Sequence, residues 1–346
     1  MKQFQAHIIS ETAPLTEALR QINALSGSVM TLLAVDADGR MTGTLTDGDV
    51  RRALINGAEL TDQVRLAMRR DFRSLPPDSS VNEIRNLRRM GLRLLPVIDA
   101  DRRIISALDL HRQHTLLPVR AVLMAGGRGE RLRPLTDTVP KPLLKVGGQC
   151  IIDRNIDAMR RCGVTDITVT TRYLADMIER HFAGTEVKCL RENEPLGTIG
   201  ALSLLPCGDP QETTLLMNSD LLTSISFEEM FLRHSDTGAD ITIATVPHSV
   251  SIPFAILTVD GDKVTGIEEK PTYTHYANAG IYMISNRLLK HLPCRRQDAP
   301  DFIRLAMEQG ACVTYYPISG TWLDIGSPAD FQQACELMRH HLNFNN

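Results

Sequence analysis

The sequence contains no run of roughly 18 consecutive apolar residues, so it predicts no transmembrane helix. It begins without the apolar segment of a signal peptide, and none of its seven cysteines forms a C-x-x-C pair. These absences favour a reducing cytoplasm over a secreted, disulfide-linked protein or a cysteine-rich zinc protein. A formal net charge of −3 provides no overall positive field for nucleic acid. We therefore expect a cytoplasmic protein that binds no membrane and no nucleic acid.

What the chain does contain is typical of α/β proteins. It has 346 residues, of which 43% are hydrophobic and 5% aromatic, enough for a sizeable core and for two or three domains. From about residue 120 onward, apolar runs typical of strands alternate with helical patterns. This alternation predicts parallel strands joined by crossover helices, so we expect an α/β fold with a doubly wound, mixed sheet over 120–346. Strand signals between Phe254 and Ile284 predict an antiparallel appendage to this sheet.

The first 115 residues contain a weak internal repeat, with one copy at Pro14–Leu54 and the other at Ser80–Arg112. Each copy begins with an amphipathic helical pattern and continues with an apolar run, a turn and a second strand signal. A capping-box pattern, S-x-x-E, marks the start of the second helix. One such α+β unit cannot cover both faces of its small sheet. We therefore expect two units side by side, at about 1–60 and 65–115.

This tandem unit resembles a pair of CBS domains over residues 1–115. In the first copy, Gly43-x-x-Thr46-x-x-Asp49 is similar to the stretch with which that family holds ribose and phosphate. The resemblance implies that Thr46 contacts a phosphate, that Asp49 takes the ribose hydroxyls, and that the ligand is a regulatory adenine or guanine nucleotide. The second copy departs from this pattern, so at most one site has its motif intact. A module that only packs or dimerises remains the alternative interpretation.

A glycine-rich segment follows the first apolar strand of the larger region. Ala121–Ala125 runs into Gly126-Gly127-Arg128-Gly129, and Arg131 and Lys141 follow. Without Cβ atoms, such a loop lets backbone N–H groups approach phosphate oxygens. The two cationic side chains add a bidentate fork and a point charge. The spacing is not G-x-G-x-x-G, which argues against a dinucleotide-dependent oxidoreductase. A tight strand–helix turn without a ligand is the alternative interpretation.

The longer pattern G-G-x-G-x-R-L-x-P-L-T, followed by K-P-L-L, resembles the sugar-1-phosphate nucleotidyltransferases over about 120–340. The resemblance implies their glycosyltransferase-A-like fold. It also implies catalytic roles for Arg131 and Lys141, which would stabilise the leaving pyrophosphate. The residues that it assigns to nucleotide binding are Ala125, Gly126, Gly127, Gly129, Arg131, Lys141, Glu194 and Gly197.

An aspartate stands at the end of another apolar strand, in Leu215-Leu-Met-Asn-Ser-Asp220. The carboxyl ends of parallel strands are where open α/β sheets bind ligands, so Asp220 is a candidate binding residue. In the family that the chain resembles, the matching aspartate binds Mg²⁺. Asp324 lies in a segment similar to the family's W-x-D-x-G-[ST], whose aspartate is the second ligand. The resemblance therefore implies a Mg²⁺ cofactor held by Asp220 and Asp324.

Two further segments are similar to the sugar-binding stretches of the same family. The resemblance implies that Glu269, within E-E-K-P, holds sugar hydroxyls and that Lys270 holds the sugar phosphate. It also implies that Asn278, within N-A-G-I-Y, contacts the sugar and that Gly280 lets the sugar approach.

The resemblance as a whole implies transfer of a nucleoside monophosphate from an NTP to a sugar-1-phosphate for surface glycan biosynthesis, with release of pyrophosphate. The CBS pair and the N-A-G-I-Y strand look closest to glucosamine-1-phosphate or heptose-1-phosphate guanylyltransferases, which favours GTP over CTP or UTP. We also expect a homo-oligomer. Two alternatives stay open. One is a cytidylyl- or uridylyltransferase acting on another phosphate, and the other is a CBS-regulated, catalytically inactive nucleotide-binding subunit.

Overall fold

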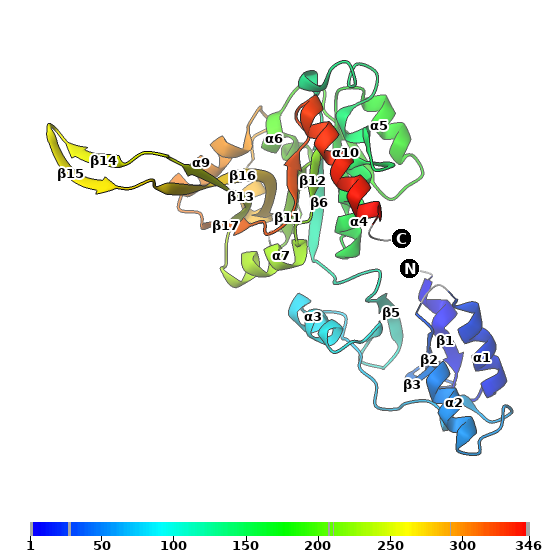
Figure 1. Ribbon diagram of the computed structural model, residues 1–346. Coiled ribbons are helices and arrows are strands. Elements are labelled where there is room, and N and C mark those ends of the chain that lie inside the picture. The colour runs from blue at the N-terminus through cyan, green and yellow to red at the C-terminus, as the bar shows by residue number, and fades with distance from the viewer. Residues whose placement is uncertain (1–2, 27–28, 207, 210, 291, 344–346) are drawn as a thin grey trace. The chain divides into compact units, whose positions relative to one another are not determined.

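Internal contacts divide the chain into two compact units. The computed structural model describes residues 3–26, 29–206, 208–209, 211–290 and 292–343 (Figure 1). One unit holds the residues up to Leu116 together with Arg161–Gly163, and the other holds Leu117–Arg160 and the residues from Val164 onward. Each unit has buried apolar clusters of its own. Among the described residues, no helix is both long enough and apolar enough to cross a bilayer.

The smaller unit contains the two predicted repeats. Its elements are η1 (Gln3–His7), β1 (Ile8–Ser10), α1 (Leu15–Ala24), β2 (Thr31–Val35), β3 (Met41–Thr46), α2 (Asp47–Ile55), η2 (Val64–Leu66), α3 (Val81–Arg89), β4 (Leu94–Ile98) and β5 (Ile104–Asp109). In each repeat a helix precedes an antiparallel strand pair, β2–β3 or β4–β5. The predicted capping box of α3 is present, since Ser80 N donates to Glu83 Oε2 at 2.7 Å and Ser80 Oγ accepts from Glu83 N.

The larger unit is built on a seven-stranded mixed sheet with the strand order β10-β9-β6-β11-β16-β13-β17. Its elements are β6 (Val119–Ala125), η3 (Glu130–Leu132), η4 (Lys141–Leu143), β7 (Lys145–Val146), β8 (Gln149–Cys150), α4 (Ile151–Arg161), β9 (Ile167–Thr171), α5 (Ala175–Phe182), β10 (Lys188–Arg191), α6 (Gly197–Gly200), η5 (Ala201–Leu204), β11 (Thr213–Asn218), β12 (Leu221–Thr223), α7 (Phe227–Asp236), β13 (Ile241–Ser251), β14 (Ile256–Asp260), β15 (Lys263–Glu268), β16 (Thr272–Ser285), α8 (Asn286–Leu289), α9 (Ala299–Glu308), β17 (Val313–Pro317), β18 (Trp322–Asp324) and α10 (Pro328–Asn343). Neighbouring strands are parallel except at β16, which runs antiparallel to both β11 and β13. The expected mixed α/β sheet is confirmed.

The direction in which strands are added reverses between β6 and β11. From β6 the chain moves outward to β9 and then β10, and it crosses back to place β11 on the other side of β6. The carboxyl ends of β6 and β11 therefore flank a topological switch point, where open α/β sheets bind ligands. The loop after β6 carries the glycines of Gly126–Gly129, and Asp220 follows the end of β11 by two residues.

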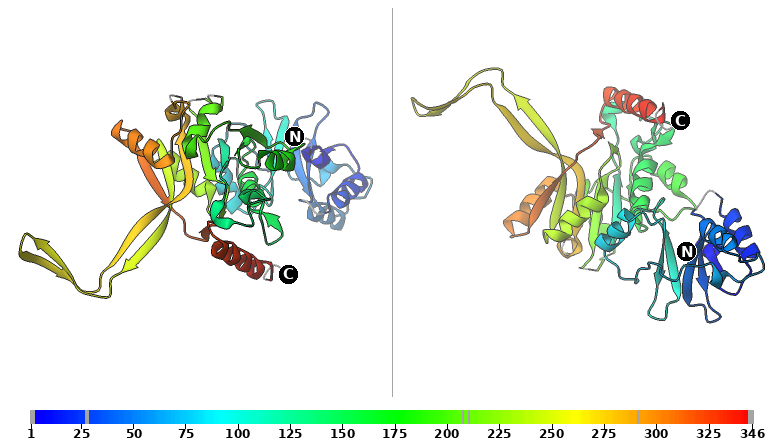
Figure 2. Two further views of the ribbon diagram at one scale, coloured as in Figure 1. Left: turned by 90° about the horizontal axis from the view of Figure 1, so that it is seen from above. Right: turned by 60° about the horizontal axis from the view of Figure 1, so that its bottom comes forward.

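The strands predicted as an antiparallel appendage are arranged differently. β16 lies inside the sheet between β11 and β13, so the prediction of an appendage is wrong for this strand. Among the strands predicted for this appendage, β14 and β15 alone form a separate two-stranded hairpin. β13 and β16 continue as a paired ribbon beyond the sheet and carry this hairpin away from the body of the unit (Figures 1 and 2). A strand signal has the same period inside a sheet and in a projecting ribbon, so the sequence pattern did not separate the two.

Candidate active site

The loop after β6 requires glycine at one position and leaves its backbone open at another. Gly129 has a φ of +61°, and a Cβ there would lie 3.0 Å from Thr136 Cγ2. Thr136 Oγ1 donates to the carbonyl of Gly129 at 2.8 Å and so holds the turn. A Cβ at Gly127, in contrast, would meet nothing within 4 Å. The backbone at Gly127 is therefore accessible to a phosphate group.

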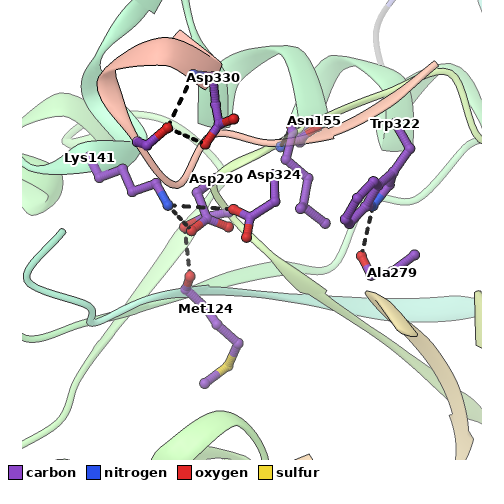
Figure 3. A network of polar contacts seen from close by, with 11 residues as sticks. Met124, Lys141, Asn155, Asp220, Ala279, Trp322, Asp324 and Asp330 are labelled. Carbon is purple, nitrogen blue, oxygen red and sulfur yellow. Dashed lines mark hydrogen bonds and ion pairs between the residues drawn. The ribbon is translucent and has the colours of Figure 1, made fainter. Parts of the chain in front are cut away.

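Two aspartates that are distant in the sequence meet through a short strand pair. β12 and β18 are antiparallel, and their register places Asp324 opposite Leu221, which directly follows Asp220. The backbone N–H of Ile325 donates to the carbonyl of Asp220 at 3.2 Å. The buried Asn155 donates from Nδ2 to the carbonyl of Leu221 at 3.0 Å and anchors β12. The two carboxylates thus lie together at the switch point (Figure 3).

A lysine lies between these two carboxylates. Lys141 begins η4, and its Nζ is 2.5 Å from Asp220 Oδ2 and 3.6 Å from Asp324 Oδ1 (Figure 3). Only 11% of the Lys141 side chain is exposed, whereas Asp220 and Asp324 keep 26% and 44%. The ammonium balances one of two adjacent negative charges, which would otherwise repel each other.

Asp324 has a raised pKa at this site. Burial is the largest cause and the neighbouring Asp220 adds to it, while Lys141 and Arg131 act in the opposite direction. Asp220 Oδ1 and Asp324 Oδ1 are buried, and neither has a hydrogen-bond partner within the described part of the chain. Two carboxylate oxygens without hydrogen bonds, one on each aspartate, are hard donors of the kind that Mg²⁺ and Ca²⁺ prefer. The residues present therefore fit a divalent metal site.

A cavity of about 510 Å³ opens beside these groups, within the usual size range of small-molecule sites. Its walls combine the glycine loop, Asp220 and several cationic side chains. They are formed by Met124, Ala125, Gly127, Arg128, Gly129, Glu130, Arg131, Lys141, Pro142, Arg172, Ser219, Asp220 and Gly326. Arg131 packs against the backbone at Gly326, where a Cβ would lie 3.0 Å from Nη2 of the arginine. Accessible backbone and clustered guanidinium groups suit this cavity to a polyphosphate.

Comparisons with known proteins agree with this chemistry. A family model described as nucleotidyl transferase matches residues 120–340, and a CBS domain model matches residues 3–56. The chain belongs to the nucleotidyl transferase family. Nucleotidyl transferases of this family generally use a divalent metal ion, which agrees with the donor set of Asp220 and Asp324. The predicted family is therefore confirmed.

Several relatives of this nucleotidyl transferase have named activities. The mannose-1-phosphate guanylyltransferase catalytic subunit beta of Danio rerio is 30% identical over 225 residues, and a putative mannose-1-phosphate guanyltransferase of Sulfolobus acidocaldarius is 28% identical over 222 residues. Each match covers 62% of this chain and 62% of the relative, so the chain spans less than two thirds of the length of these curated relatives. The structure of a putative glucose-1-phosphate thymidylyltransferase from Bacillus anthracis has a TM-score of 0.51 at 24% identity, covers 64% of this chain and 95% of that chain, and shows a shared fold.

Most of the residues predicted to bind the nucleotide come together at the cavity. Those that line it are Ala125, Gly127, Gly129, Arg131 and Lys141. Gly126 lies next to the same wall, because a Cβ there would be 3.5 Å from Cβ of Arg172. Glu194 and Gly197 are placed elsewhere. Glu194 is exposed and outside the cavity, and a Cβ on Gly197, whose φ is +77°, would lie 2.6 Å from Asp298 Oδ1. The structure thus gives Gly197 a packing role against the chain that precedes α9.

Three of the residues near the cavity that were not predicted share one position in the fold. Glu192 is buried, and its Oε1 would lie 3.0 Å from a Cβ on Gly126. Arg172 and Ser219 line the cavity, and Ser219 Oγ donates to the carbonyl of Met124 at 2.6 Å. Each of the three directly follows the last residue of a parallel strand, β10, β9 or β11. That position is the signal that could have identified them.

The four predicted sugar-phosphate residues are divided between two places. Gly280 lies beside the end of β11, because a Cβ there would be 2.5 Å from Asn218 Nδ2. Asn278 Oδ1 accepts from the N–H of Gly280 at 2.9 Å, and its Nδ2 donates to the Tyr282 hydroxyl at 2.9 Å. Glu269 and Lys270 are exposed and lie between β15 and β16, on the projecting ribbon and hairpin. The structure therefore does not bring Glu269 and Lys270 to the cavity of their own chain.

The residues predicted to bind a regulatory nucleotide have internal partners. Thr46 and Asp49 form a capping box at the start of α2. The buried Asp49 carboxylate also pairs with Arg52 at 2.5 Å and with Arg69 at 2.8 Å. Burial raises the pKa of Asp49, but hydrogen bonds from Thr46, Arg69 and Arg52 outweigh burial and hold it below its usual value. These contacts give Asp49 a structural role in the smaller unit, and its predicted contact with ribose stays a prediction.

Proposed function

We propose that this chain transfers a nucleoside monophosphate from an NTP to a sugar-1-phosphate and releases pyrophosphate. The observation that carries the proposal is the pair of buried oxygens without hydrogen bonds, Asp220 Oδ1 and Asp324 Oδ1, beside a glycine loop at the switch point of the sheet. We propose GTP as the donor, because the relatives named above are guanylyltransferases. Their names favour mannose-1-phosphate as the acceptor, and the sequence resemblance adds glucosamine-1-phosphate and heptose-1-phosphate as candidates.

The reaction needs no nucleophile from the protein. A phosphate oxygen of the sugar-1-phosphate attacks the α-phosphorus in line, a new P–O bond forms, and the bond to the leaving pyrophosphate breaks. The work of the chain is to position both substrates and to neutralise charge. Gly127 and Gly129 offer backbone to phosphate oxygens, and Arg131 faces the same cavity. A divalent ion at Asp220 and Asp324, Mg²⁺ in our proposal, would supply further charge neutralisation when bound.

Lys141 and Arg131 have distinct roles in this proposal. Arg131, held against Gly326, would stabilise the negative charge that builds on the leaving pyrophosphate. Lys141 forms ion pairs with both aspartates, so its effect on the pyrophosphate would be added to its role in balancing their negative charge. Their assignment as catalytic residues rests on these positions together with the sequence resemblance.

The direct test measures pyrophosphate release from each of the four NTPs with each of a panel of sugar-1-phosphates in the presence of Mg²⁺. We expect the highest kcat/KM with GTP. Asp220→Asn and Asp324→Asn should each lower kcat/KM by at least ~10²-fold, the scale of removing one preorganised transition-state interaction. Asp236→Asn, an exposed acid in the same unit, is the matched control and should leave the rate unchanged. Absence of pyrophosphate with every substrate pair would refute the proposed function.

The two alternatives make different predictions in the same assay. A catalytically inactive subunit would release no pyrophosphate, and the shared site of Asp220, Asp324 and Lys141 argues against it. A cytidylyl- or uridylyltransferase would prefer CTP or UTP and a phosphate other than a sugar phosphate. The cytoplasmic location and the homo-oligomer remain predictions.

We also propose that the smaller unit binds an adenine or guanine nucleotide, as the CBS resemblance implies. A cavity of about 470 Å³ in this unit is lined by Thr46, Asp47 and Gly48 from the first repeat and by Arg93, His111 and Arg112 from the second. Its hydroxyl, backbone and cationic groups could hold a phosphate, and Asp49, which lines a second cavity together with Thr46, is the proposed contact of the ribose. Calorimetry of the full chain with ATP, AMP, GTP and GDP would test this, and Arg93→Ala should weaken the binding. If no nucleotide binds outside the catalytic cavity, the unit serves packing alone.

A further inference from the structure

The ribbon of β13 and β16, together with the β14–β15 hairpin, forms an arm at residues 247–278. Every residue of this arm is exposed except Ile252, Ile256, Gly266 and Pro271. β14 and β15 pair only with each other in the described sheets. The arm has therefore no buried core of its own, and an isolated two-stranded hairpin is marginally stable in water at best.

The arm presents a large apolar surface to solvent. Between 38% and 71% of each of eight apolar or aromatic side chains is accessible, namely Val250, Phe254, Leu257, Val259, Val264, Ile267, Tyr273 and Tyr276. With about 150 Å² for a fully exposed side chain of this kind, the accessible area is roughly 700 Å² for one arm. Docking this area on a protein would bury about 1,400 Å² in total, which is within the range of stable protein–protein interfaces.

The arm also carries residues that the proposed reaction needs. Glu269 and Lys270, the predicted sugar-phosphate residues, precede Thr272 at the outer end of the ribbon. Asn278, at its inner end, is six residues away from Thr272, which is about 20 Å along an extended strand. Gly280 lies beside β11, whereas Lys270 lies beyond the outer end of the ribbon, and neither Glu269 nor Lys270 lines the cavity. The site of a single chain is thus incomplete.

The strand ladder argues that the arm does not return to its own cavity. After one irregularity between Ile243 and Thr245, β13 and β16 keep an unbroken register from Thr245↔Asn278 to Ser251↔Thr272. The hydrogen bond from Ile252 N to Pro271 O, 3.0 Å long, continues this pairing to the base of the hairpin. The paired ribbon projects away from the body of the unit (Figures 1 and 2), and reaching a neighbouring molecule would leave its ladder unchanged.

We infer that the arm docks on a second copy of this chain and supplies Glu269 and Lys270 to the cavity of that copy. This inference rests on the proposed function. The acidic pair Glu268–Glu269 on the arm would meet a cavity whose lining is cationic on balance, with Arg128, Arg131, Lys141 and Arg172 against Glu130 and Asp220. Lys270 would then bind the phosphate of the sugar-1-phosphate in trans, and the site would be complete only in the assembled protein.

Complementation between two inactive variants tests whether Lys270 acts in trans. Asp220→Asn damages the body of a chain, and Lys270→Ala damages its arm. When the two are co-expressed with different tags and the mixed assembly is purified, a Lys270→Ala body receives an intact arm from its partner. We expect the mixed assembly to regain about half of the wild-type activity, because one of its two sites then has every residue.

The matched control combines Asp220→Asn with Asp324→Asn, which both damage the body, and it should regain nothing. Mixed assemblies of Asp220→Asn and Lys270→Ala that remain as inactive as the single variants would refute the inference, because arms acting in cis cannot complement. A Lys270→Ala variant with wild-type KM for the sugar phosphate would refute it as well.

A second measurement needs no substrate and separates this inference from the proposed function. Phe254→Asp combined with Ile267→Asp places charge on the apolar surface of the arm, and in sedimentation equilibrium we expect at least a 100-fold weaker self-association than for the wild type. Met307→Asp, at a similarly exposed residue of α9, is the control and should associate normally. A wild-type chain that is monomeric at micromolar concentration and still releases pyrophosphate would refute the arm exchange and leave the proposed function standing.

Discussion

Replacing Lys141 with methionine should destabilise the metal-free protein, because methionine has a similar length and no charge. Removing one partner of a fully buried ion pair costs about 3–5 kcal/mol. Here Asp220 and Asp324 keep 26% and 44% of their side-chain surface, so solvent screens part of the repulsion between them. We therefore expect the free energy of unfolding of Lys141→Met to fall by about 2 kcal/mol near neutral pH.

The deficit of this variant should depend on pH and on divalent cations. The pKa of Asp324 is already raised by burial and by Asp220, and Lys141 opposes that shift, so losing the lysine should raise it further. A carboxyl group with a raised pKa in the folded state takes up a proton there before it does in the unfolded chain. The difference in unfolding free energy between the wild type and the variant is therefore largest above the pKa of Asp324, and it shrinks as the pH falls through that pKa. Millimolar Mg²⁺ should restore more stability to the variant than to the wild type, because it replaces the missing positive charge.

Urea unfolding in the presence of a chelator measures this effect, with fluorescence of the single tryptophan as the signal. Trp322 lies on β18, next to Asp324, and its Nε1 donates to the carbonyl of Ala279 at 2.9 Å (Figure 3). Lys145→Met, at an exposed lysine of β7, is the matched control. Equal unfolding free energies for the two variants at neutral pH would show that Lys141 does not balance the aspartates. A deficit that does not shrink as the pH is lowered stepwise from neutral would refute the electrostatic explanation.

Two further predictions concern buried titratable groups. Asp49→Asn should lower the free energy of unfolding by about 2 kcal/mol, because it weakens the pairs with Arg52 and Arg69. This loss should shrink at acidic pH, where the wild-type carboxylate with its lowered pKa also becomes protonated. Urea unfolding measures the loss, and Asp47→Asn, at a more exposed ion pair, is the control. Burial lowers the pKa of His234 to about 4, with Asp240 acting in the opposite direction, so the unfolded chain takes up a proton first and the protein should lose about 3 kcal/mol as the pH falls from about 6.5 to about 4. His234→Gln should remove this pH dependence, and an unchanged pH profile of unfolding in that variant would contradict the assignment.

The parts of the site that could be predicted from the sequence lie at the ends of parallel strands. Ala121–Ala125 runs into glycines and Leu215–Met217 leads to Asp220, and both patterns are local: an apolar strand followed by residues suited to a ligand. Their meeting at one edge of the sheet follows from the parallel order of β6 and β11. The same rule would have identified Glu192 and Arg172, which follow β10 and β9.

Other features depend on contacts that no local pattern contains. Lys141 and Asp220 are 79 residues apart in the sequence, and nothing near either residue predicts that the ammonium lies between the two aspartates. Asp49 matches a ligand-binding motif and a capping box equally well, because both place a carboxylate three residues after a threonine. The additional pair with Arg69, which is brought close by pairing of its backbone with Thr44, is contained in neither pattern.

The arm shows most clearly where local information ends. In β14, Leu257 and Val259 alternate with the polar Thr258 and Asp260, the period of a strand with one face to be covered. That pattern specifies a buried face but not the chain that buries it. Within the part of the chain that the structure describes, the face is open, with half or more of Leu257 and of Val259 accessible. A neighbouring molecule could cover this apolar face while the ladder of β13 and β16 stays intact. We therefore expect the face to be buried by a second molecule.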